Sequence, residues 1–200
     1  MKKIILFLHG YGSNGSDLIS LKDYIVIDHS SSEFISPNAP EPCELNFFGY
    51  QWFTLKERSF EELTLGLKSA FNYLDNMIKD ITDRHSVKSD QISIIGFSQG
   101  SMLATYYALL KETDFHSIVS LSGSLPESIL KSLTILENNT KYLIFHGKLD
   151  DVVSYQQALQ THQFLESKNI KNKIVLDNDC QHSISPLAIN EINLLYQDWL

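Results

Sequence analysis

Short apolar runs alternate with longer helical patterns along most of the chain, and this alternation constrains the fold more than any other feature. Five runs predict strands: Ile4–Leu8, Gln91–Ile95, Ser117–Leu121, Tyr142–Phe145 and Lys173–Leu176. Four of them are almost continuously apolar or rich in Ile and Val, as strands buried on both faces are. A weaker candidate, Phe34-Ile35-Ser36, stops at Pro37. The pattern predicts an α/β fold with a mostly parallel twisted sheet and helices on both faces.

The helical patterns between these runs have recognisable starts. From Phe60 to Asp83, apolar residues recur in steps of three and four, which describes one face of a helix. Ser59 and Glu62 form the sequence of a capping box at its start. Further helices are expected over Met102–Lys111, from Ser154 to about Leu165, and from Ser185-Pro186 toward the C-terminus.

Composition indicates an ordered protein that does not bind polyanions. Of the 200 residues, 43% are hydrophobic and 20% are charged, which is close to the average for globular domains. This length predicts a single domain over residues 1–200. Sixteen basic and 24 acidic residues give a net charge of −8, which repels nucleic acids and anionic membranes at long range.

Cysteines and the N-terminus indicate a reducing compartment. Cys43 and Cys180 form no metal-ligand spacing, so two free thiols are expected, with a single disulfide as the alternative. Two lysines precede the apolar run Ile4–Leu8, but its five residues are fewer than the about 7–15 of a secretory signal. No apolar stretch is long enough to insert stably in a membrane. We therefore expect a soluble, cytoplasmic protein.

The segment Gly96-Phe97-Ser98-Gln99-Gly100 lies between a predicted strand and a predicted helix. In this context a G-x-S-x-G sequence predicts a nucleophile elbow, a sharp turn that presents the serine above the sheet. The flanking glycines are required because a Cβ there would strike the neighbouring strand or helix. The alternative is a plain glycine-rich turn.

A nucleophilic serine needs a base, and the order of residues in this fold restricts the choice. The order is serine, then acid, then histidine. Five histidines precede either the serine or the expected acid, and His162 lies within a helical pattern. His182 remains as the expected base, in a loop after the last predicted strand.

The acid is expected in the loop His146–Asp151, which follows the strand Tyr142–Phe145. Parallel strands end at one edge of a sheet, so Asp150 or Asp151 could reach Ser98. Asp177 and Asp179 also follow a strand, but they are close to His182 and are interpreted as turn-forming residues.

An oxyanion hole is expected from two backbone N–H groups. One belongs to Gln99, directly after the nucleophile, and the other to the glycine-rich loop after the first strand. That loop also contains G-x-G-x-x-G, as Gly10, Gly12 and Gly15, and Glu33 follows at a distance suited to a dinucleotide site. The histidine before the first glycine disfavours this nucleotide-binding alternative.

Taken together, four segments resemble the phospholipase/carboxylesterase family of α/β-hydrolases, which includes acyl-protein thioesterases and small bacterial carboxylesterases. These segments are Leu8-His9-Gly10-Tyr11-Gly12, Gly96–Gly100, His146-Gly147-x-x-Asp150 and His182, and Ser36–Pro40 and Trp52-Phe53 match further landmarks. The resemblance covers essentially the whole chain. It implies an α/β-hydrolase fold with little or no lid.

The resemblance also implies roles for particular residues. Ser98 would be the nucleophile, Asp150 the acid and His182 the base, with the N–H groups of Tyr11 and Gln99 forming the oxyanion hole. No metal or organic cofactor is implied. The expected partner is a small-molecule acyl ester or thioester, bound by a monomer or homodimer.

Two features leave the substrate open. The resemblance implies that Trp52 and Phe53, in an aromatic segment with Phe48, line the substrate pocket, although packing over the sheet edge is an equal alternative. Tyr11 and Ser101 replace residues that are usually smaller or aliphatic in the family, and the chain is short. A carboxylesterase is favoured over a lysophospholipase or acyl-protein thioesterase, and a non-catalytic binding module is the alternative outside enzymes.

Overall fold

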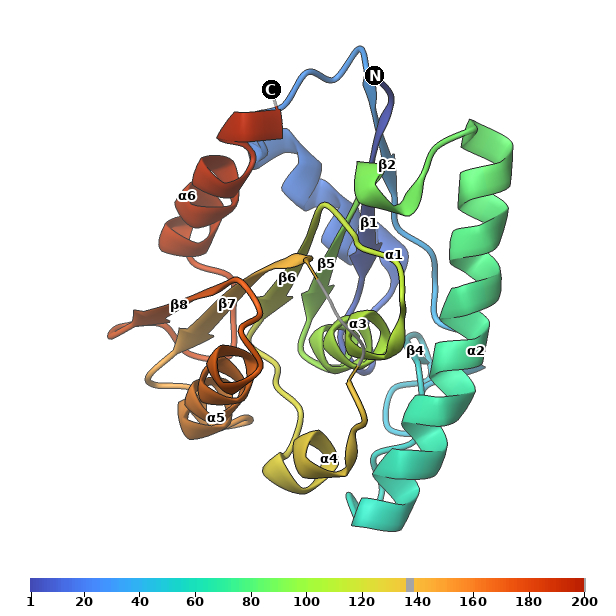
Figure 1. The fold of residues 1–200 in the computed structure, drawn as a ribbon. Helices are drawn as coiled ribbons and strands as arrows, with labels where there is room; N and C mark the ends of the chain where they lie inside the picture. Colours follow the sequence, from blue (N-terminus) through green and yellow to red (C-terminus); the bar gives the residue numbers. More distant parts are fainter. Residues whose placement is uncertain (136–138, 200) are drawn as a thin grey trace.

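A six-stranded parallel sheet forms the centre of the molecule (Figure 1). The computed structural model describes residues 1–135 and 139–199. The strand order is β2-β1-β5-β6-β7-β8. The strands are β1 (Lys3–Leu8), β2 (Ser32–Ile35), β5 (Ile92–Phe97), β6 (Ser117–Leu121), β7 (Lys141–Gly147) and β8 (Asn172–Asp177). All five predicted strands and the weaker β2 candidate are therefore present.

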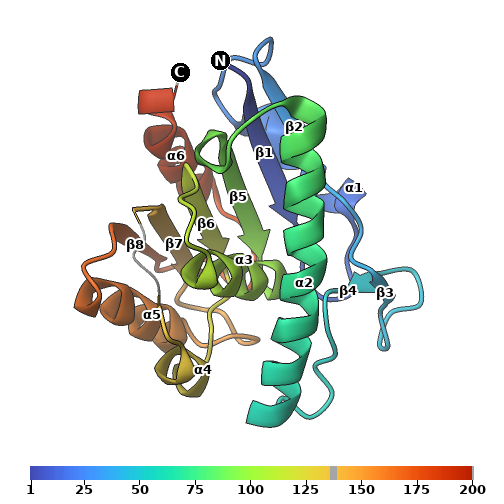
Figure 2. The ribbon, with the colours of Figure 1, turned by 45° about the vertical axis from the view of Figure 1, so that its right-hand side comes forward.

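Helices cover both faces of this sheet (Figure 2). One face carries α2 (Phe60–His85), α3 (Gln99–Leu110), α4 (Glu127–Ser132) and α5 (Tyr155–Ser167). The other carries α1 (Gly15–Leu18), the 3-10 turn Ile19–Tyr24 and α6 (Pro186–Leu195), and two further 3-10 turns lie at Ser89–Gln91 and Gln197–Trp199. None of the helices in the described ranges combines the length and apolarity needed to cross a membrane.

Coverage on both sides explains the continuous apolar runs. In β1, Ile4 and Leu6 pack into the core beneath α2 and α3, whereas Ile5 and Phe7 pack against the opposite layer. Every residue of β1 is buried. Alternate side chains of a strand point to opposite faces, so a strand between two helical layers needs apolar residues at every position.

The start of α2 differs in one detail from the predicted capping box. The Ser59 hydroxyl accepts the Glu62 N–H at 3.1 Å, as expected. The Glu62 carboxylate, however, accepts the N–H groups of Glu57 and Arg58 rather than that of Ser59. The helix continues two residues past the predicted Asp83, to His85. Its C-cap is Ser86, whose φ is 51°.

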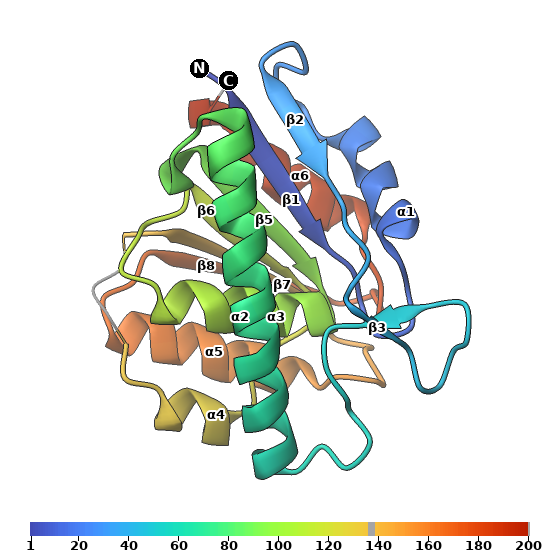
Figure 3. The ribbon, with the colours of Figure 1, turned by 90° about the vertical axis from the view of Figure 1, so that its right-hand side faces the viewer.

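The sheet order places a switch point between β1 and β5. From β1 the chain first adds β2 on one side and later β5 on the other. In parallel sheets, sites form at the carboxyl ends of strands next to such a reversal. A short hairpin not predicted from the sequence, β3 (Glu41–Pro42) with β4 (Tyr50–Gln51), projects beside this edge (Figure 3).

Candidate active site

Ser98 occupies a strained turn between β5 and α3. Its φ of 51° and ψ of −113° lie in a region that residues with a side chain rarely adopt. Its N–H donates to the Leu121 carbonyl at 2.8 Å, which holds the turn against β6. Strain of this kind persists only where the surroundings determine it, and it is frequent at functional sites.

The glycines around Ser98 are required by close backbone contacts. A Cβ on Gly96 would lie 2.4 Å from the Gly100 carbonyl oxygen. A Cβ on Gly100 would lie 2.0 Å from the carbonyl oxygen of Leu8 in β1. Both distances are far below a van der Waals contact, so the steric reason expected for the two glycines is confirmed.

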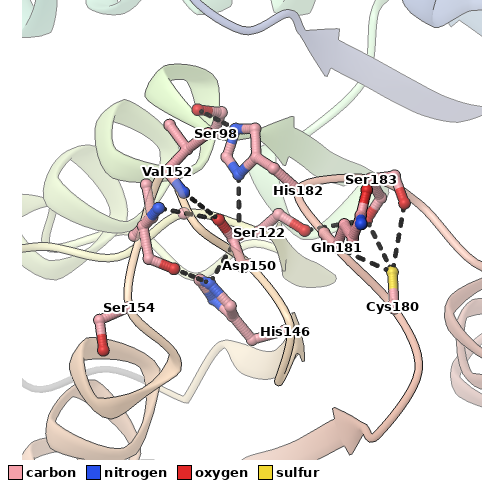
Figure 4. A network of polar contacts seen from close by, with 12 residues as sticks. Ser98, Ser122, His146, Asp150, Val152, Ser154, Cys180, Gln181, His182 and Ser183 are labelled. Carbon is pink, nitrogen blue, oxygen red and sulfur yellow. Dashed lines mark hydrogen bonds and ion pairs between the residues drawn. The ribbon is translucent and has the colours of Figure 1, made fainter.

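The structure brings Ser98, His182 and Asp150 together (Figure 4). His182 Nε2 lies 3.0 Å from Ser98 Oγ, and His182 Nδ1 lies 2.7 Å from Asp150 Oδ2. The three residues come from the ends of β5, β7 and β8. Asp151, the alternative acid, is exposed, so of the two candidates Asp150 is the one that contacts His182.

The loop that carries His182 is fixed from both sides. Ser122, at the end of β6, donates its hydroxyl to the Ser183 carbonyl at 2.9 Å. The Leu149 N–H donates to the Cys180 carbonyl at 3.0 Å, which joins this loop to the one that carries Asp150. Asp177 accepts the Ser185 hydroxyl and the Asp179 N–H, the turn-forming role expected for it.

The Asp150 carboxylate is buried and well hydrogen-bonded. Burial alone would raise its pKa, but the N–H groups of Val153 and Val152 and the His182 ring together hold the pKa below its usual value. The two N–H groups donate to Oδ1 at 2.8 and 2.9 Å. The lowered pKa keeps Asp150 ionised at neutral pH. Its other oxygen, Oδ2, faces His182 and holds the imidazole in one orientation.

His146 is a member of this network that the sequence did not reveal. Its Nε2 lies 3.0 Å from Asp150 Oδ2 and 2.8 Å from the Val153 carbonyl oxygen. Both atoms are acceptors, so Nε2 carries a proton. Burial lowers the pKa of His146, which keeps the ring neutral. The signal available in the sequence is the four-residue spacing between His146 and Asp150 within one strand-end loop.

Two backbone N–H groups beside Ser98 remain available to a ligand. Within the part of the chain that the structure describes, no protein group accepts the N–H of Tyr11 or Gln99. The neighbouring loop N–H groups of Gly12, Ser13 and Gly15 are all used by protein oxygens. A dinucleotide site would need the N–H groups of Gly12, Ser13 and Gly15 for a pyrophosphate, together with a helix that starts at this loop. Those N–H groups already bind protein oxygens and α1 has only four residues, so the dinucleotide-binding alternative is wrong.

A cavity of about 420 Å³ opens beside Ser98 and His182. Its size lies in the lower part of the range of roughly 300–1,000 Å³ that small-molecule sites occupy. Besides Ser98 and His182, the wall residues come from five separate segments: Tyr11, Leu55, Arg58, Leu63, Gln99, Met102, Gly123, Ser124, Pro126, Val152, Val153 and Gln157. A wider hollow of about 600 Å³ lies along the outer side of α2, between Tyr73 and Asp83, and contains none of the residues described above.

The aromatic residues expected in the pocket do not line this cavity. Trp52 and Phe53 are buried in the core, and Phe48 is 92% exposed at the tip of the β3–β4 hairpin. Trp52 instead supports the site from beneath, because its Nε1 donates to the His9 carbonyl at 2.8 Å. The Gln99 side chain binds the same segment, accepting the Trp52 N–H and donating to the Phe53 carbonyl. Trp52 and Phe53 are therefore packed in the core, whereas Phe48 neither packs there nor lines the cavity.

Cys43 and Cys180 are both buried free thiols. Across residues 1–135 and 139–199, no group of three His, Cys, Asp or Glu side chains is placed to hold a metal ion.

Comparison with known proteins gives one family. The family model described as Phospholipase/Carboxylesterase matches residues 1–197. Acyl-protein thioesterase 1 of Debaryomyces hansenii is 29% identical over 185 residues, covering 86% of this chain and 79% of the relative. Acyl-protein thioesterase 1 of Saccharomyces cerevisiae is 30% identical over 179 residues, covering 82% and 78%.

Solved structures agree with this result. The crystal structure of esterase PE8 superimposes with a TM-score of 0.90 at 28% identity, covering all of this chain and 93% of that one. The carboxylesterase of Bacillus cereus gives a TM-score of 0.77 at 18% identity, covering 100% of this chain and 89% of that one, and shows the shared fold.

Proposed function

The chain belongs to the phospholipase/carboxylesterase family, whose members are serine hydrolases of esters and thioesters, and from this premise we propose that Ser98, His182 and Asp150 are its catalytic triad. The observation that carries the proposal is the continuous hydrogen-bonded line from Ser98 Oγ through the His182 ring to Asp150. It is the arrangement that a serine nucleophile needs for activation.

In the proposed reaction, Ser98 Oγ attacks the acyl carbon while His182 Nε2 takes its proton. Asp150 accepts the Nδ1–H of His182 and stabilises the imidazolium that forms. The N–H groups of Tyr11 and Gln99 stabilise the oxyanion. His182 then protonates the leaving alcohol or thiol, and the reverse sequence with water releases the acid.

Fluorophosphonate labelling tests the nucleophile. Intact mass should show one adduct on the wild-type protein and none on Ser98→Ala. Ser124→Ala is a matched control, because this second serine of the same cavity should leave the adduct in place. No adduct on folded wild-type protein would instead favour the non-catalytic binding module.

We further propose a small carboxylic ester as the substrate, rather than a long-chain lipid or lipidated protein. The support is the modest cavity of about 420 Å³. Turnover of p-nitrophenyl esters should peak at short to medium acyl lengths. A steady rise in kcat/KM toward hexadecanoyl esters or thioesters would favour the lysophospholipase or acyl-protein thioesterase alternative, which the names of the relatives support.

A further inference from the structure

Arg58 gives the cavity beside Ser98 a permanent positive charge. Among the described residues that line the cavity, it is the only one with a fixed charge, and no carboxylate lines it. Most of the remaining wall is apolar: Leu55, Leu63, Met102, Pro126, Val152 and Val153. A ligand in this cavity therefore meets an apolar surface with one guanidinium.

The Arg58 guanidinium has no protein partner. Within the part of the chain that the structure describes, neither an ion pair nor a hydrogen bond engages it. Lys56, two residues earlier, instead forms an ion pair with Glu44 at 3.2 Å. In a protein with 24 acidic residues and a net charge of −8, a guanidinium without a carboxylate partner is left available to a ligand.

The position of Arg58 does not serve the stability of α2. It directly precedes Ser59, the N-cap of this helix, where the positive end of the helix dipole disfavours a cation. Its φ is 52°, in the left-handed region that is unfavourable for a residue with a side chain. The Glu62 carboxylate holds this backbone by accepting the Arg58 N–H at 2.7 Å, so Glu62 fixes the residue while the guanidinium stays unpaired.

We propose that Arg58 forms an anion-binding subsite, and that the preferred ester carries a carboxylate or phosphate on its acyl or alcohol part. This rests on the proposed function, since the subsite acts on an ester bound at Ser98. A guanidinium binds either anion through two parallel N–H···O bonds, which an apolar ester of the same length cannot form. The apolar wall would contact the chain between the ester and the anion.

Paired esters test the subsite. On the acyl side, p-nitrophenyl hemiadipate is compared with p-nitrophenyl hexanoate, and on the alcohol side para-carboxyphenyl hexanoate is compared with phenyl hexanoate. For each pair, the ratio of kcat/KM values is measured for the wild type, Arg58→Gln and Lys56→Gln. Comparing ratios between variants cancels the intrinsic reactivity of each ester.

Arg58 is exposed, so in at least one pair Arg58→Gln should lower the preference for the charged ester by about two- to fivefold, the effect of a solvent-exposed ion pair. Lys56→Gln removes the same charge outside the cavity and should keep the wild-type ratio. Equal ratios in the wild type and Arg58→Gln for both pairs would overturn the proposal.

A binding measurement separates this proposal from the proposed function. Calorimetry on Ser98→Ala compares adipic acid monoanilide with hexananilide, which need no turnover. Tighter binding of the charged anilide that disappears in Ser98→Ala with Arg58→Gln supports the subsite. Equal affinities of the two anilides, together with equal kcat/KM ratios for the alcohol-side ester pair, overturn it. If the wild type hydrolyses no ester but keeps the Arg58-dependent preference in binding, the proposed function alone fails.

Discussion

His146 and His182 both contact Oδ2 of Asp150, so one carboxylate oxygen faces two imidazole rings. His182 faces the cavity, whereas the His146 side chain is completely buried and joins Asp150 to the Val153 carbonyl. The Val153 N–H in turn donates to Asp150 Oδ1. Together these contacts close a loop around the carboxylate, which makes His146 a positioning residue for the proposed acid.

Replacing His146 should lower kcat and leave KM unchanged. His146→Leu removes the N–H donor to Asp150, and one hydrogen bond to a buried carboxylate corresponds to about 1.5–3 kcal/mol, or at least tenfold in rate. His146→Gln keeps a donor and should recover part of kcat in the same ester assay. Equal loss in both variants, with matching losses of stability in urea, would indicate a purely structural role.

The β3–β4 hairpin acts as a support for the loop that carries Tyr11. Gly12 donates its N–H to the Tyr50 carbonyl at 2.9 Å, and the Tyr50 N–H donates to the Ser13 carbonyl at 2.8 Å. Asn46 adds a side-chain bond to the Gly12 carbonyl at 2.7 Å. At the same contact, a Cβ on Gly49 would lie only 2.0 Å from the Gly12 carbonyl oxygen. The hairpin thus determines where the Tyr11 N–H is held.

Gly49→Ala should therefore reduce ester turnover without touching the triad. The added methyl group forces the hairpin and the Tyr11 loop apart, and losing one oxyanion donor costs about 10²–10³ in kcat. We expect a loss of at least tenfold because displacement is partial. Phe47→Ala, at the 93% exposed tip of the same hairpin, is the control and should keep full activity. Wild-type kcat in Gly49→Ala would show that the hairpin does not position the loop.

The C-terminal end of the chain is joined to the sheet by His116. The His116 ring stacks on Trp199 with centroids 3.8 Å apart, and the backbone N–H of His116 donates to the carbonyl of Ile92 at the start of β5. Burial, helped by nearby Lys141, lowers the pKa of His116 from 6.5 to about 4. The folded protein therefore holds a neutral imidazole here at a pH where the unfolded chain would protonate it.

The lowered pKa of His116 makes the free energy of unfolding depend on pH. Between pH 4 and 6.5 the unfolded chain binds a proton at His116 that the folded protein does not, so stability rises with pH across this interval. The urea midpoint should increase accordingly. His116→Phe keeps an aromatic ring against Trp199 and should flatten the slope without abolishing it, because burial also lowers the pKa values of His9 and His146. An unchanged slope in His116→Phe would contradict this assignment.

Local sequence determined the strands, the elbow at Ser98 and the choice of His182. These depend on neighbouring residues: apolar periodicity, glycines that avoid a backbone contact, and the order of residues along a parallel sheet. The family resemblance already favoured Asp150 over Asp151, but only the tertiary structure showed that Asp150 contacts His182, that Trp52 and Phe53 are buried, and which segments form the cavity walls. Those outcomes depend on the packing of segments far apart in the chain, and no local pattern records which of their side chains meet.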